Sequence, residues 1–302
     1  MTANIFATRW PWRRESKRFA PTVTGWGEST HAELAWRSSR GAAGRWGIAG
    51  AVVGIVIGLI AFAPASWLAQ AVGRLTDERL ILAEARGTVW SGSAIATLTG
   101  GPGSRDAATL PGRLSWSVGW RAMGAEIRLT HACCLAEPLV LGVRPGLARF
   151  TIALQPSARG VSGRWPAFWL SGLGTPWNTL ALGGEVRLAS PGLTVERVQG
   201  RWRLDGRADI ELHGASSRIA TIEPLGSYRF SVQGDASNPG TAALTLTTLD
   251  GALLLNGNGT WSSGGVRFRG EASAKPGDEA ALANLLNIIG RRSGARSVIA
   301  IG

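Results

Sequence analysis

The feature that most constrains this chain is a long run without a charged residue near its N-terminus. Residues 47–63 consist only of Gly, Ala, Val, Ile, Leu and Phe, and no charge occurs from residue 46 to residue 73. A helix needs about 20 such residues to cross the hydrocarbon core of a bilayer. Trp46 and Trp67 stand where interfacial aromatic residues are expected. The run therefore predicts a transmembrane helix over residues 47–63, with an interfacial extension to residue 73.

Two other interpretations of this run are open. A cleaved signal peptide would also have a basic start and an apolar core, but this core is longer than usual, and Pro64 is unfavourable beside a cleavage site. A buried helix of a soluble protein is the second alternative, and such a helix rarely lacks a polar face over this length. We therefore favour a retained anchor.

The residues before the run predict its orientation. Eight of the 32 Lys and Arg residues and three of the 20 acidic residues precede residue 47, so this tail has a net charge of +5. Positive flanks stay in the cytoplasm, which predicts a cytoplasmic N-terminus, a single pass through the inner membrane and a periplasmic remainder. The tail, residues 1–46, shows no sustained hydrophobic period, and we predict that it is disordered.

Beyond residue 74 the sequence alternates between apolar and polar residues, which is typical of half-buried strands. The clearest examples are residues 113–120, 149–155, 228–233 and 266–269, and shorter ones occur at 126–129, 185–188 and 209–212. Gly and Pro punctuate these segments at the spacing of antiparallel meanders. Asp250-Gly251 predicts a tight hairpin, and the Asn-Gly pairs at residues 256–257 and 258–259 predict further turns. The period therefore predicts a mainly β domain over residues 74–302.

Two helical segments are expected outside the anchor. One runs from Pro64 to about Thr76, and the other covers residues 278–292, where acids precede an apolar stripe and arginines follow it. A last strand is expected at residues 297–301. The predicted fold is thus a curved antiparallel meander sheet, half-barrel or sandwich-like, with one N-terminal transmembrane helix and a C-terminal amphipathic helix.

The charge of +12 does not indicate a nucleic-acid protein. Outside the tail the arginines are scattered singly along the predicted strands, and no basic stripe with interleaved aromatic residues occurs. We therefore expect no nucleic-acid partner.

The sequence offers few residues at the spacing that a catalytic or metal-binding site requires. His131 lies close to Cys133 and Cys134, but a metal site needs three or four preorganised ligands. The adjacent cysteines could form a vicinal disulfide, and we favour two small buried thiols. Asp205, Asp209 and Glu211 are close in sequence, and we expect them around a charged turn. Most Trp residues beyond the anchor are expected in the core. We therefore predict no enzyme activity, no cofactor, and no catalytic or metal-binding residues.

Several segments, taken in order, resemble a known family. They are Pro64-Ala65-Ser66-Trp67-Leu68, residues 82–92 with Gly87-Thr88-Val89-Trp90, residues 224–228, and the C-terminal segments 285–292 and 297–301. Together they are similar to protein N of the type II secretion system, over roughly residues 45–302. The chain departs from that family in the tail, because members usually begin almost at the anchor.

The resemblance implies an accessory subunit of the inner membrane that supports export of folded proteins from the periplasm. It implies protein–protein contacts with other subunits, such as the secretin or the inner-membrane linker protein. An alternative from the alternating pattern is a periplasmic β-trough that binds or transfers lipid or another hydrophobic ligand. That alternative requires the faces with Phe150, Ile152 and Leu154, and with Tyr228, Phe230 and Val232, to be uncovered.

Overall fold

The computed structural model describes residues 28–121, 124–157, 160–235 and 237–302, with side chains from Arg45 onward. Two compact units are present, residues 1–60 and 61–302. In the first unit, helix α1 (Glu28–Ala61) is continuous, and its apolar side chains from Ile48 to Ile60 are largely exposed. Across the part of the chain that is described, no helix combines the length and the apolar character that crossing a membrane requires.

Helix α1 changes one prediction and leaves another open. The tail predicted as disordered is helical from Glu28 onward, because Ala, Glu and Arg, which favour helices, dominate the segment that leads into the apolar run. The rest of the predicted tail, residues 1–27, lies outside the described residues. The span over residues 47–63 stays a prediction.

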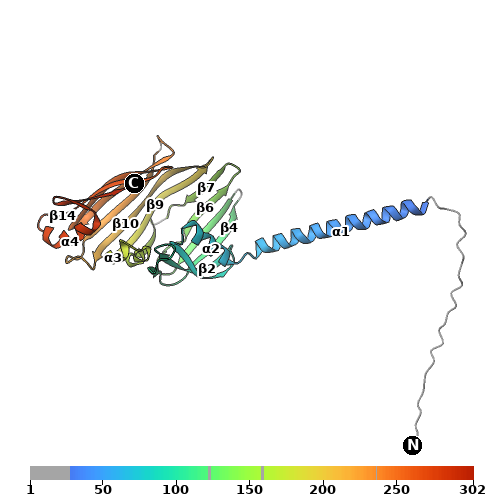
Figure 1. The fold of residues 1–302 in the computed structure, drawn as a ribbon, viewed down its shortest axis with the longest axis horizontal. Coiled ribbons are helices and arrows are strands. Elements are labelled where there is room, and N and C mark those ends of the chain that lie inside the picture. Colours follow the sequence, from blue (N-terminus) through green and yellow to red (C-terminus); the bar gives the residue numbers. More distant parts are fainter. Residues whose placement is uncertain (1–27, 122–123, 158–159, 236) are drawn as a thin grey trace, which may run out of the picture. The chain divides into compact units, whose positions relative to one another are not determined.

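The second unit is built on a single antiparallel sheet of 16 strands (Figure 1). The helices of this unit are α2 (Ala65–Leu75), the 3-10 helix η1 (Ala167–Leu173), α3 (Trp177–Leu180) and α4 (Glu279–Ile289). The strands are β1 (Leu80–Gly87), β2 (Ser91–Thr99), β3 (Ala107–Thr109), β4 (Leu114–Arg121), β5 (Gly124–His131), β6 (Leu139–Pro145), β7 (Arg149–Leu154), β8 (Val161–Pro166), β9 (Leu182–Val198), β10 (Arg201–Ser217), β11 (Gly226–Gly234), β12 (Thr241–Gly251), β13 (Leu253–Ser262), β14 (Gly265–Ala274), β15 (Arg291–Ser293) and β16 (Arg296–Ile301).

The sheet is a meander with few departures. Its order is β1-β2-β4-β5-β6-β7-β9-β10-β11-β12-β13-β14-β16-β15, with β3 beside β2 and β8 beside β9. The long strand β9 pairs with β8 through its first half and with β7 through its second half. Among the described residues no pairing joins β1 to β15, so the sheet is open. This confirms the predicted mainly β, antiparallel fold.

Alternation gives the sheet two different faces, because successive side chains of a strand point to opposite sides. The face with Trp116, Ile152 and Tyr228 is named the apolar face here, and the opposite side is the polar face. Arg, Glu, Asp and Thr residues dominate the polar face, as in Arg207, Asp209 and Glu211 of β10. The helices pack on the apolar face.

At the C-terminal end of the sheet, α4 covers the apolar face. Leu282, Leu285 and Leu286 are at most 1% exposed and pack against Tyr228 and Leu253. The buried Ser297 hydroxyl donates a 2.6 Å hydrogen bond to the Leu286 carbonyl, which ties α4 to β16. Burying three leucines stabilises this end by several kcal/mol, at about 1.5–3 kcal/mol for each side chain.

At the N-terminal end, α2 has the equivalent role. Ala65 and partly buried residues of α2 pack against Leu82, Ala94 and Trp116, and the Trp116 indole donates hydrogen bonds to the Thr88 and Val89 carbonyls. Helix α2 matches the segment predicted from Pro64 to about Thr76, but it belongs to the β-rich unit. That unit therefore begins at residue 61, where residue 74 was predicted.

Helix η1 and the β2–β3 region close the adjacent part of this face. Ala96, Leu110 and Cys134 are buried there, with Trp165 and Trp169 packed against them. Figure 1 shows α2, α3 and α4 at the same ends of the strands. The helices therefore cover the apolar face near one set of strand ends.

Predicted turns at the Asn-Gly pairs are wrong, because residues 253–262 form the regular strand β13. Gly257 is required there by close packing: a Cβ atom would lie 2.5 Å from Cζ of Phe268. The predicted hairpin at Asp250-Gly251 is also not a tight two-residue turn. Pairing of β12 with β13 stops at Leu246 and Gly257, and the Thr248 hydroxyl bridges the gap to the Leu255 backbone.

Candidate functional site

The apolar face between the helical covers carries two rows of carbon side chains that run across the strands from β4 to β10. Cross-strand neighbours in an antiparallel ladder lie side by side on one face. The outer row consists of Trp120, Ala125, Val143, Ile152, Val195 and Leu204. The inner row consists of Val118, Ile127, Leu141, Leu154, Leu193 and Gly206.

None of these row side chains reaches full burial. Val118 alone joins a core cluster, the one beneath α2. The principal contacts of α2 and α4 are with strands outside the rows, β1 and β2 for α2 and β14, β15 and β16 for α4. Helix η1 contacts β2, β3 and β9, and the core cluster that contains its Trp169 includes no row residue. The rows are therefore an apolar surface on which the helices do not sit.

Four further side chains of the apolar face lie outside the outer row, at the strand ends where β6 turns into β7 and β9 into β10. We name this group the rim. It comprises Pro145, Phe150, Arg197 and Trp202, which follow one another across the strands. Phe150 and Trp202 are each 38% exposed, and Trp120, on β4 at the far end of the outer row, is 73% exposed. Exposed aromatic side chains that adjoin an apolar surface form the kind of patch that marks an interaction site.

Arg197 is the charged member of the rim. Its guanidinium carbon lies 5.5 Å from the centre of the Trp202 ring, in the range of a cation–π contact. The same strand ends carry further arginines, Arg144, Arg149, Arg201 and Arg203, and within the described residues none of these five forms an ion pair. Glu196 is the nearby acid, and it accepts a hydrogen bond from Thr151. Arg144, Arg149, Arg201 and Arg203 alternate with the rim residues along their strands and lie on the polar face, so the rim has Arg197 as its cation, unpaired among the described residues.

The polar face is organised by ion pairs. Glu126 accepts contacts from Arg128 at 2.7 Å and from Arg121 at 2.8 Å. The Arg128 hydrogen bond and the charge of Arg121 hold the pKa of Glu126 below its ordinary value, against the opposing effect of burial. A shallow pocket of about 340 Å³ lies beside this cluster, lined by residues of β4 and β5. Its acid is neutralised by two arginines, so it offers no free base for catalysis.

The acids of β10 were predicted near a charged turn, and the structure places them in a regular strand instead. Asp209 pairs with Arg207 at 2.9 Å, and Glu211 pairs with His213 at 2.7 Å and with Arg229 at 2.8 Å. Hydrogen bonds from His213 and Arg229 lower the pKa of Glu211, again against burial. These carboxylates are ionised partners of bases on one face, which is a structural arrangement.

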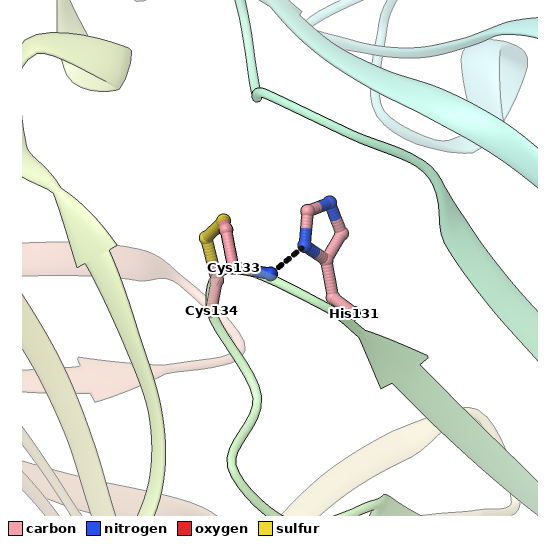
Figure 2. The surroundings of a disulfide bond; sticks show 3 residues. All are labelled: His131, Cys133 and Cys134. Atoms are coloured by element: carbon pink, nitrogen blue, oxygen red, sulfur yellow. Dashed lines mark hydrogen bonds between the residues drawn. A yellow bond between two sulfur atoms is a disulfide. The ribbon is translucent and has the colours of Figure 1, made fainter.

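Cys133 and Cys134 form a disulfide (Figure 2). This corrects the prediction of two buried thiols: Cys134 is buried, but Cys133 is exposed. His131 is buried beside them, and its Nδ1 accepts a 3.3 Å hydrogen bond from the Cys133 backbone N–H. Burial lowers the pKa of His131, so the ring is held neutral.

This cluster brings three potential metal ligands within 4.8 Å of one another. Two of them are tied up in the disulfide, and Nδ1 of His131 is occupied by the backbone hydrogen bond. Nε2, which is buried without a hydrogen-bond partner, points away from the sulfurs in Figure 2. The geometry therefore fits a structural cluster better than a metal centre.

Sequence reasoning named no site residues, and it missed the rim. The alternation marked Phe150 and Trp120 as apolar-face residues, but it could not show which part of that face the helices leave open. Trp202 and Arg197 lie next to the turn between β9 and β10, so their adjacency is set by the register of that hairpin.

The fold and the faces define a class of protein: an open antiparallel sheet with one apolar and one polar face. Within that class, the model of the family type II secretion system (T2SS), protein N matches residues 78–299, and the chain belongs to this family. Membership makes it an accessory component of type II secretion, a protein-transport system, and implies association with other components of that system. No match was found among curated proteins or among solved structures.

Proposed function

We propose that this protein is an inner-membrane accessory subunit of the type II secretion system that acts by binding other subunits, without enzymatic activity. The observation that carries the proposal is the family match, which extends over nearly the whole sheet, residues 78–299. The paired carboxylates at Glu126 and Glu211 support a binding role, because their charges serve ion pairs.

Residues 47–63 are proposed as the anchor, with the N-terminus in the cytoplasm and residues 74–302 in the periplasm. Two observations support this topology. The tail has a net charge of +5, as expected of a cytoplasmic flank. In α1, side chains such as Ile48, Ile55 and Ile57 are more than 60% exposed, and a bilayer would remove this apolar surface from water.

The proposed partners are the secretin or the inner-membrane linker protein, reached through the polar face. A face rich in arginine and carboxylate pairs can exchange ion pairs with a partner and favours a specific orientation. Arg128 and Arg229 are examples of arginines that are already held in place by acids of the same face.

In-cell photo-crosslinking tests the partner role. A photoreactive amino acid is placed on the polar face at Ser117 or Thr245, and crosslinked products are identified by mass spectrometry. Secretion subunits are expected among the products, and secretion of exported proteins is expected to fall in a deletion strain. Normal export in the deletion strain, together with no crosslink to any secretion subunit, would contradict the proposal.

Topology is tested separately with a membrane-impermeant maleimide on cells with a permeabilised outer membrane. Ser39→Cys lies in the tail, and Ser263→Cys lies in the exposed turn between β13 and β14. Labelling is expected only for Ser263→Cys, with the unsubstituted chain as the background control. Equal labelling of both variants would overturn the proposed topology.

A further inference from the structure

We propose that the outer and inner rows, together with the rim, bind the acyl chains and anionic headgroup of a glycerophospholipid. This inference is independent of the secretion role, since it depends only on the chemistry of the apolar face. The rows supply an apolar surface for the acyl chains. At the edge of that surface, the rim supplies the cation Arg197 with aromatic rings beside it.

The rows match an acyl chain in chemistry. Apart from the Trp120 indole N–H, their side chains carry no hydrogen-bond donor or acceptor. The backbone groups of these inner strands are already paired in the ladder on both sides. A ligand on the two rows finds few polar partners. An extended peptide would therefore bury its own N–H and C=O groups there without hydrogen bonds. A hydrocarbon chain has no such requirement.

The rows also match an acyl chain in length. Strands of a sheet lie about 4.8 Å apart, so a row from β4 to β10 is roughly 24 Å long. One leaflet of a bilayer has about 15 Å of hydrocarbon. The rows can therefore hold an acyl chain along their length, and the exposed Trp120 at one end of the outer row can cover it.

The rim adds charge complementarity. Arg197 lies between Phe150 and Trp202 in register and forms no ion pair among the described residues. Aromatic rings beside a cation are typical of membrane interfaces, where side chains contact hydrocarbon on one side and water on the other. A phospholipid has the same division between its acyl chains and its headgroup. A phosphate on Arg197 would form charge-assisted hydrogen bonds with its guanidinium group.

A lipid trough requires the apolar side chains of β7 and β11 to be uncovered, and only those of β7 are. Tyr228 is 6% exposed under the α4 core, so that part of the face is closed to a ligand. Phe230 is occupied by a contact with Phe268, at 6.2 Å between ring centres. The face with Phe150, Ile152 and Leu154 is the part left open, and the proposed lipid site is restricted to it.

Site-specific photo-crosslinking of the full chain in cells tests the proposal. The photoreactive residue replaces Ile152, on the apolar face, or Ala153, the next residue on the same strand and on the polar face. A phospholipid adduct is expected at Ile152 at a level at least about tenfold above that at Ala153. Equal adducts at the two positions, or a protein crosslinked at Ile152, would overturn the lipid site.

A second experiment tests the headgroup with variants that keep the two rows intact. Full chain purified in detergent is mixed with phosphatidylglycerol or phosphatidylcholine, and bound lipid is counted by native mass spectrometry. Preference for phosphatidylglycerol is expected, and Arg197→Glu is expected to reduce its retention about tenfold, which corresponds to the loss of one charge-assisted contact. Arg269→Glu, on the polar face, is the matched control and should bind as the unsubstituted chain does.

The outcomes of this second experiment separate the sources of binding. No preference between the two lipids, or equal losses in Arg197→Glu and Arg269→Glu, would contradict a headgroup site at the rim. Export of secreted proteins is measured separately, in the deletion strain and in a strain that carries Arg197→Glu. Normal lipid binding with no effect of the deletion on export would refute the secretion role alone, and the reverse result would refute the lipid site alone.

Discussion

The Tyr228 hydroxyl donates a 3.0 Å hydrogen bond to the Leu253 carbonyl inside the core beneath α4. Tyr228 starts the apolar face of β11, and Leu253 is the first residue of β13, so this bond crosses β12. The bond matters because pairing of β12 with β13 has already stopped at Leu246 and Gly257. A side chain thus supplies the link that the backbone ladder lacks at this point.

Tyr228→Phe is expected to lower the free energy of unfolding by about 1–2 kcal/mol, since it leaves the buried Leu253 carbonyl without this donor. Chemical denaturation of the full chain followed by Trp fluorescence measures the loss. A change below about 0.3 kcal/mol would show that water replaces the hydroxyl at no cost.

The same tyrosine predicts a loss of stability in alkali. Burial, with the nearby charge of Asp250, raises the pKa of Tyr228 above its ordinary value of 10.0. The unfolded chain therefore releases this proton first, and stability falls as the pH rises above about 10. Tyr228→Phe should have a flatter alkaline limb than the unsubstituted chain, and parallel limbs would contradict the role of this group.

Leu285 and Ile288 of α4 provide a matched pair for testing the cover of the C-terminal core. Leu285 is 1% exposed and Ile288 is 41% exposed, although both lie on one helix. Leu285→Ala is expected to cost about 2–5 kcal/mol through lost burial and the cavity left behind. Ile288→Ala is expected to cost less than about 1 kcal/mol. Similar losses in denaturation midpoint would mean that α4 does not pack as described.

Glu211 should make the sheet sensitive to acid. Its partners His213 and Arg229 hold its pKa below the ordinary value of 4.5 in the folded chain. A depressed pKa contributes stability above the unfolded value, and this contribution is lost as the pH falls through and below 4.5. Glu211→Gln should therefore be less stable at pH 7 and should lose less stability on acidification. Glu223→Gln, an exposed acid without an ion pair among the described residues, is the control.

Much of the sheet could be predicted because its strands are half-buried and alternate strictly. The strands expected at residues 113–120 and 228–233 correspond to β4 and β11. The helix expected at residues 278–292 is α4, but it ends at Ile289, and Arg291 and Arg292 begin β15. Strands β6 and β8 were missed. Residues 139–143 of β6 are nearly all apolar, and β8 is interrupted by Gly163, so neither shows a period of two.

What the sequence could not provide is the register and the cover of each face. Asn-Gly pairs favour turns by local preference, yet Gly257 serves in a strand because the Phe268 ring lies over it. Tertiary packing overrides a local signal at such a position. The rim has the same origin: Arg197 and Trp202 meet because β9 and β10 pair in one particular register, and no spacing in the sequence encodes that contact.

The disulfide between Cys133 and Cys134 is expected to contribute little to stability. A crosslink stabilises mainly by closing a loop in the unfolded chain, and this effect grows with the length of the loop. Here the cysteines are adjacent, so the loop is the smallest that a chain can form. Reduction, or the double variant Cys133→Ser and Cys134→Ser, should change the free energy of unfolding by less than about 1 kcal/mol. Thermal unfolding with and without reductant measures this.

Thiol labelling extends the test to the two sites separately. After reduction, exposed Cys133 should react with a maleimide before Cys134, which is 3% exposed, because reactivity requires access to the thiolate. The single variants Cys133→Ser and Cys134→Ser assign each rate. Equal rates would show that reduction opens the segment around His131, and a large fall in melting temperature on reduction would show that the bond supports the core beneath η1 and Trp169.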